Sequence, residues 1–102
     1  MAEEEIILQT NDVRVRVLTL LPGEAGPAHH HTDVTDHMFG VSGTVEVIMK
    51  NPDARITLTP GKRCRVEVGR IHRVRNGLTD DISQYLLVQG VGNYDFLKED
   101  TT

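Results

Sequence analysis

Residues 27–37, with the sequence PAHHHTDVTDH, contain four histidines and two aspartates. Imidazole nitrogens and carboxylate oxygens are common protein ligands of divalent transition metals. Side chains alternate between the two faces of an extended chain, so His29 and His31 share one face there and His30 occupies the other. Asp36 and His37 are separated in the same way. This spacing fits one part of a metal site, and it also fits a solvent-exposed histidine tract.

A further histidine, His72, lies in the segment GRIHRVRN, directly after a turn-forming sequence. In an extended strand His72, Val74 and Asn76 share one face, and Arg73 and Arg75 share the other. Strands that are distant in sequence lie side by side in a β-barrel. His72 can therefore complete a site of three nitrogen ligands with two of the earlier histidines.

The elements that must position these side chains are predicted to be short β-strands. Alternating or β-rich segments occur at residues 13–20, 44–49, 54–58 and 82–90, separated by turn-forming sequences such as LPGEAGP, VSG and KNPDA. In residues 13–20 valines alternate with Arg14 and Arg16, which predicts a half-buried strand with both arginines facing water. No segment has apolar residues at helical spacing. We therefore predict an all-β sandwich or barrel.

The chemically interesting residues fall into two spaced motifs, which are Gly23, His29, His31, Asp36 and Gly43, and then Gly61, Glu67, Gly69, His72 and Asn76. In identity and spacing they resemble the two motifs of the cupin family, in particular its small, single-domain bacterial members. The first cupin motif carries a Glu where this chain has Asp36. The second carries a Pro where this chain has Glu67.

The resemblance implies a cupin-type double-stranded β-helix, which is a jelly-roll barrel, with one divalent transition metal inside. It implies that His29, His31 and His72 bind the ion, and that Asp36 is the fourth ligand. Imidazole and carboxylate ligands suit Fe, Mn, Ni, Cu or Zn, and ligand type alone does not choose among these metals.

The sequence offers weaker expectations for other side chains. Met38, Val74 and Gln84, together with Phe39 and Tyr85, are candidates for lining a cavity, although simple core packing explains them equally well. His30 and His37 are expected to face away from the ion. Cys64 is expected to be a small buried apolar residue rather than a nucleophile.

Length and composition restrict the class of protein. The 102 residues suffice for one domain, residues 1–102, with tails at 1–5 and 98–102 that are expected to fray. One cysteine, an acidic N-terminus and no long apolar run predict a cytoplasmic protein without membrane contact. A net charge of −4 and only four aromatic residues argue against nucleic-acid binding, despite the basic segment at 61–75.

The expected function is that of a metal-dependent enzyme, dioxygenase-like or isomerase-like, acting on a small organic acid or another chelating small molecule. The alternative is a non-catalytic module that binds or senses a metal or small ligand. No Glu, Lys or Tyr can be placed beside the ion from the sequence, so the catalytic residues stay unassigned. A homodimer is also expected, paired through exposed sheet edges, the face of Arg14 and Arg16, and the ISQYLLVQG run.

Overall fold

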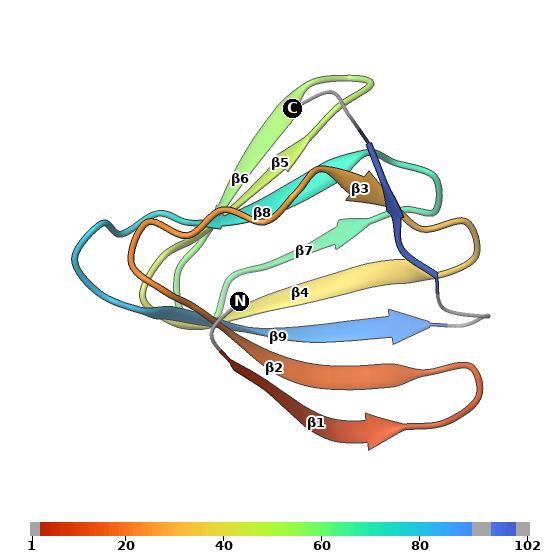
Figure 1. Cartoon of the computed structure of the whole chain (residues 1–102), viewed down its shortest axis with the longest axis horizontal. Coiled ribbons are helices and arrows are strands. Elements are labelled where there is room, and N and C mark those ends of the chain that lie inside the picture. The colour runs from red at the N-terminus through yellow and green to blue at the C-terminus, as the bar shows by residue number, and fades with distance from the viewer. Residues whose placement is uncertain (1–2, 91–94, 100–102) are drawn as a thin grey trace.

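The computed structural model describes residues 3–90 and 95–99, which form ten β-strands (Figure 1). The strands are β1 (Glu3–Gln9), β2 (Arg14–Leu20), β3 (His29–His30), β4 (Thr35–Ser42), β5 (Val45–Met49), β6 (Ala54–Leu58), β7 (Arg63–Val66), β8 (His72–Asn76), β9 (Ser83–Gly90) and β10 (Leu97–Lys98). The described residues contain no helix, and hence none that is long and apolar enough to cross a membrane.

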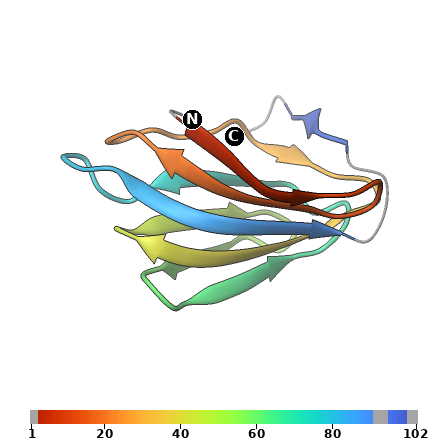
Figure 2. The ribbon, with the colours of Figure 1, turned by 90° about the horizontal axis from the view of Figure 1, so that it is seen from below.

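The strands form two five-stranded antiparallel sheets, in the orders β1-β2-β9-β4-β7 and β10-β3-β8-β5-β6. Figure 1 shows the sheets facing each other, with β3 and the dark blue β10 at the right-hand end of the barrel. Seen from below in Figure 2, the long strands β2, β9 and β4 run side by side. The predicted all-β jelly-roll fold is confirmed.

Strand alternation fills the space between the sheets with apolar side chains. In β5, Val45, Val47 and Met49 are buried and the residues between them are half-buried. In β8, His72, Val74 and Asn76 alternate in the same way, as the sequence predicts. The inward-facing rows therefore combine core residues and polar residues on the same strands.

The alternation of β2 has the opposite phase to the one expected. Arg16, Leu18 and Leu20 are buried, whereas Val15 and Val17 are half-buried. The prediction that Arg16 faces water is therefore wrong. A shift of one residue turns every side chain of a strand to the other face, and burying the two large leucines decides between the phases. Their burial takes Arg16 into the barrel with them.

Both ends of the described chain pair with neighbouring strands. Residues 3–5, expected to belong to a frayed tail, are part of β1, and Glu3 pairs with Thr19 of β2. Lys98 pairs with His29, and the backbone nitrogen of Glu99 donates to the carbonyl of Ala28. Residues 1–2 and 100–102, also expected to fray, lie outside the described residues.

Two motif residues have structural roles. Gly43 forms the turn between β4 and β5 with a φ of 70°, and a Cβ atom there would overlap the hydroxyl of Ser83. The Asn76 amide donates to the carbonyls of Leu21 at 2.9 Å and Asp81 at 2.8 Å, and it accepts from Ser83 Oγ at 2.6 Å. Asn76 thus ties two connecting loops to the barrel.

Candidate metal centre

The structure brings together the four side chains that the motifs single out. His29, His31, Asp36 and His72 each offer one ligand atom, and these atoms all lie within 4.8 Å of one another. Oδ2 of Asp36 lies 3.2 Å from Nε2 of His31 and 3.1 Å from Nε2 of His72. β3 and β8 are neighbours in one sheet, with His29 paired to His72, whereas Asp36 comes from β4 in the facing sheet. The cluster therefore spans the interior of the barrel.

Backbone carbonyls orient all three imidazole rings. Nδ1 of His29 lies 2.9 Å from the carbonyl of Pro27, and Nδ1 of His72 lies 2.8 Å from the carbonyl of Arg70. Nδ1 of His31 makes the same contact with the carbonyl of Asp95. A carbonyl oxygen accepts but does not donate, so each ring donates its Nδ1 proton and turns Nε2 inward. This arrangement is typical of metal-binding histidines.

The arrangement around Asp36 fits a bound cation. A neutral ring that donates through Nδ1 carries a lone pair on Nε2. Two such nitrogens, from His31 and His72, face one carboxylate oxygen and repel it unless a proton or a cation lies between them. Ligands of one ion with bonds of about 2.1 Å lie at most about 4.2 Å apart. The donor atoms lie up to 4.8 Å apart, so they must draw closer together to share an ion.

The protonation states of His29 and Asp36 suit metal binding. Burial lowers the pKa of His29 to about 4, so this ring is neutral at neutral pH. Burial opposes ionisation of Asp36, but hydrogen bonds with His31 and His72 outweigh it and lower its pKa. Burial likewise opposes charge on His31, but the Asp36 carboxylate outweighs it and raises the pKa of that imidazole, so a proton competes with a metal ion at this ring. Asp36 is thus an anion ready to accept a cation.

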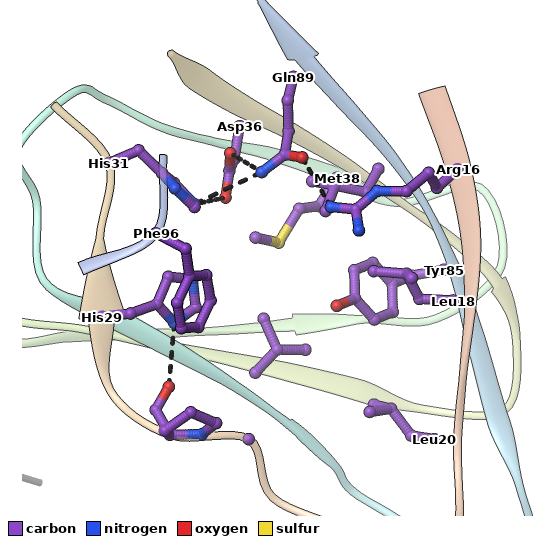
Figure 3. Close-up of a pocket in the computed structure, with 14 residues that line it drawn as sticks. Arg16, Leu18, Leu20, His29, His31, Asp36, Met38, Tyr85, Gln89 and Phe96 are labelled. Carbon is purple, nitrogen blue, oxygen red and sulfur yellow. Dashed lines mark hydrogen bonds and ion pairs between the residues drawn. The ribbon is translucent and has the colours of Figure 1, made fainter. Parts of the chain in front are cut away.

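A cavity of about 140 Å³ adjoins the cluster, and Figure 3 shows the side chains around it. Its apolar wall is made by Leu18, Leu20, Met38, Val74, Tyr85 and Leu87. Met38, Val74 and Tyr85 were candidates for this role. Gln84 was also a candidate, but it faces outward from β9, where it donates to the hydroxyl of Thr19. The phase of β9 is set by Tyr85 and Leu87, which point inward.

Gln89 is a buried polar residue of the site that the sequence analysis missed. Its Nε2 donates to Oδ1 of Asp36 at 2.9 Å and lies 3.4 Å from Nε2 of His31. Its Oε1 accepts from Nη2 of Arg16 at 2.7 Å. Tyr85, Leu87 and Gln89 are spaced two residues apart, so strand alternation could have placed Gln89 on the inner face with the other two. Arg16 was missed because the phase of β2 was misjudged.

Phe96 is a second missed residue, and it comes from the C-terminal segment. Its ring stacks on His29 with ring centres 4.0 Å apart and an interplanar angle of 21°. Asp95 contacts His31 through its carbonyl and Thr32 through its carboxylate. The segment is held beside the cluster by the pairing of β10 with β3. No local pattern in the sequence indicates this contact.

The remaining histidines and the cysteine are not part of the cluster. Nδ1 of His30 lies 2.5 Å from Oε1 of Glu99. His37 is opposite in phase to the buried Asp36 on β4 and pairs with Arg65 of β7. Cys64 packs against the core, and burial raises the pKa of its thiol to about 11, which keeps it protonated at neutral pH.

A family model described as "Cupin domain" matches residues 16–88, so the chain belongs to the cupin family. No curated protein sequence matches the chain. Its fold, with the His and Asp cluster inside the barrel, is that of a cupin with a potential metal site.

Several solved structures share the fold. A protein with a double-stranded beta-helix domain from Klebsiella pneumoniae subsp. pneumoniae MGH 78578 is 27% identical, with a TM-score of 0.78 over 93% of this chain and 82% of that one. KdgF from Halomonas sp. is 18% identical, with a TM-score of 0.73 over 88% and 78% of the two chains. A recombinant oxalate oxidase in complex with glycolate is 16% identical, with a TM-score of 0.76 over 85% of this chain and 46% of that one.

Proposed function

We propose that this protein is a metal-dependent cupin that binds a small chelating molecule at an ion held by His29, His31, His72 and Asp36. The observation that carries the proposal is the orientation of the three imidazoles. Each donates Nδ1–H to a backbone carbonyl and presents Nε2 to the interior, beside one ionised carboxylate. Such a donor set suits Fe, Mn, Ni, Cu or Zn.

The place of the cluster on the cavity wall supports a ligand-binding role. An ion held by these four side chains would supply Lewis-acid chemistry for a substrate that chelates through two oxygens. The apolar wall of Leu18, Met38 and Tyr85 excludes water from the rest of such a molecule. A small organic acid fits both requirements.

We favour an enzyme, of a dioxygenase-like or isomerase-like kind, because of Tyr85. This residue is buried on the cavity wall, and Figure 3 shows its hydroxyl pointing into the cavity. A phenol hydroxyl can donate or accept a proton at a bound substrate. Tyr85 is thus a candidate for the proton-transfer group that the sequence alone does not place.

The alternative is a non-catalytic module that binds or senses a metal or a small ligand. It is favoured by the composition of the wall, because no lysine or glutamate is among the described residues that line the cavity. Under this alternative the Tyr85 hydroxyl positions a ligand and no bond changes.

The deciding experiment begins with elemental analysis of protein purified without an affinity tag, followed by reloading with each of the five metals. Catechols, 2-oxo acids and 1,3-diketones are then screened for oxygen uptake or a change in absorbance. Turnover that needs both the metal and Tyr85 supports the enzyme. Tight ligand binding without turnover in any metal form favours the binding module, and protein that takes up no metal overturns both.

We also propose a homodimer, on a basis that differs from the one expected. Arg16 cannot contribute to an interface because it is buried inside the barrel. β1, in contrast, is the outer strand of its sheet, and Ile6, Ile7 and Leu8 there are each more than 50% exposed. An apolar edge strand is a ready surface for pairing with a second copy.

A further inference from the structure

Arg16 is a buried cation on the cavity wall. Its side chain is 7% exposed and stands in the inward-facing row of β2 with Leu18 and Leu20. Removing a guanidinium from water is unfavourable unless charged or polar partners compensate it. A leucine or methionine would fill this position in an apolar barrel without that penalty. The position therefore calls for an explanation beyond packing.

Arg16 shares the carboxylate of Glu4 with Arg14. Oε2 of Glu4 lies 3.1 Å from Nη1 of Arg16, and Oε1 of the same carboxylate lies 4.0 Å from Nη2 of Arg14. One carboxylate thus serves two guanidinium groups. The Glu4 side chain is 37% exposed, so it sits at the edge of the water while Arg16 is fixed inside. An incoming anion can displace it at modest cost.

Gln89 fixes the distance between this cation and the metal cluster. Its amide group donates to Oδ1 of Asp36 at one end and accepts from Nη2 of Arg16 at the other. Figure 3 shows the three side chains in a row along one side of the cavity. Two hydrogen bonds and the width of one amide group thus separate Oδ1 of Asp36 from Nη2 of Arg16.

We propose that Arg16 binds a carboxylate of the ligand, and that the natural ligand is a short acid with two anionic ends. One end, a 2-hydroxy or 2-oxo acid group, chelates the ion, and the other pairs with Arg16 by charge-assisted hydrogen bonds. The cavity of about 140 Å³ is close to the roughly 150 Å³ that holds a benzene molecule, so the carbon chain is short. Chelation of the ion by one end of the ligand rests on the proposed function, and pairing of the other end with Arg16 does not.

The competing explanation is a purely structural Arg16–Glu4 ion pair. The two explanations differ in what Glu4 does. In a structural pair, removing the Glu4 charge affects stability and leaves ligand affinity unchanged. In an anion site, Glu4 competes with the ligand, so Glu4→Gln strengthens anion binding. This variant keeps Arg16 in place and tests the inference even if substitution of Arg16 impairs folding.

The test is calorimetric titration of the Ni(II)-loaded protein with malate and with 2-hydroxybutyrate, in which a methyl group replaces the distal carboxylate. The wild type is expected to bind malate on the order of 10-fold more tightly. Arg16→Gln is expected to remove that preference while still binding 2-hydroxybutyrate, and Glu4→Gln is expected to increase it. Arg55→Gln is the matched control. Arg55 is exposed on β6 and pairs with Glu46 of β5, so this substitution should leave the affinity for both acids unchanged.

Nickel content is measured first in every variant, which separates the two proposals. A wild type that takes up no nickel overturns the proposed function. The same pair of acids is then titrated into the metal-free protein, where a weaker preference for malate that depends on Arg16 still supports the anion site. Equal affinity of the wild type for malate and 2-hydroxybutyrate, or a Glu4→Gln variant with unchanged preference, overturns the anion site.

Discussion

Nε2 of His72 lies 3.1 Å from Oδ2 of Asp36, although 36 positions separate the two residues in the chain. His72 stands on β8 and Asp36 on β4, which belong to different sheets. A cation bound between them therefore joins the two halves of the barrel. Substitution of a ligand, or of a residue that orients one, should therefore change metal affinity. Removal of the metal should change the stability of the fold.

The four ligand residues should contribute unequally to metal affinity. His29→Ala, His31→Ala and His72→Ala each remove an inward-facing nitrogen and should abolish stable metal binding. Asp36→Ala should weaken it by about 10–100-fold, the loss typical of a supporting group. Metal titration of the variants checks this. His30→Ala and His37→Ala are the controls with unchanged stoichiometry, and loss of metal in His37→Ala with retention in Asp36→Ala would require a new ligand set.

Gln89→Leu should weaken metal binding by about 10-fold, because the amide that holds Oδ1 of Asp36 in place is lost. Gln84→Leu is the matched control on the same strand, since Gln84 faces outward. Competition with a chelating dye measures both affinities. Equal affinities in the two variants would show that Asp36 needs no support from Gln89.

Metal removal should lower thermal stability. At a metal concentration 100 times the dissociation constant, binding to the folded state alone contributes about 2.7 kcal/mol. For a domain of this size, 1 kcal/mol shifts Tm by roughly 4–8 °C, so EDTA should lower Tm by about 10 °C or more. Differential scanning calorimetry with and without EDTA provides the measurement. The His72→Ala variant should show no EDTA effect, and an equal effect there would place the metal elsewhere.

Cys64 should be unreactive at moderate pH. Burial raises the pKa of its thiol from 9.0 to about 11, and the thiolate is the reactive form. This increase of about two units in the pKa lowers the thiolate fraction at pH 8 by about 100-fold. Alkylation by iodoacetamide should slow by the same factor. The rate should still rise tenfold per pH unit up to about pH 11. Alkylation as fast as that of the urea-unfolded protein at pH 8 contradicts this expectation.

Light scattering at micromolar concentration should give twice the chain mass of 11.4 kDa. Ile7→Lys places a charge on the exposed edge strand β1 and should shift the protein toward the monomer. Thr57→Lys, on the exposed side of β6, is the control. A wild-type monomer at this concentration would remove the basis for the dimer.

The sequence determined the fold class and the composition of the central cluster. Alternation within β5 and β8 depends on neighbouring residues only, because period-two patterning follows from the geometry of a single strand. The motif spacing likewise identified His29, His31, Asp36 and His72, which the structure brings within reach of one ion. The family match over residues 16–88 confirms the resemblance that these motifs indicated.

The tertiary structure decided what surrounds the cluster. In β2 both phases of the alternation are locally acceptable, and only the burial of Leu18 and Leu20 between the sheets turns Arg16 inward. Phe96 reaches His29 because β10 pairs with β3, a contact between segments more than 60 residues apart. Such contacts depend on which strands become neighbours in the folded barrel. A strand's own sequence fixes its two faces, and the packing of the whole chain fixes which face meets the cavity.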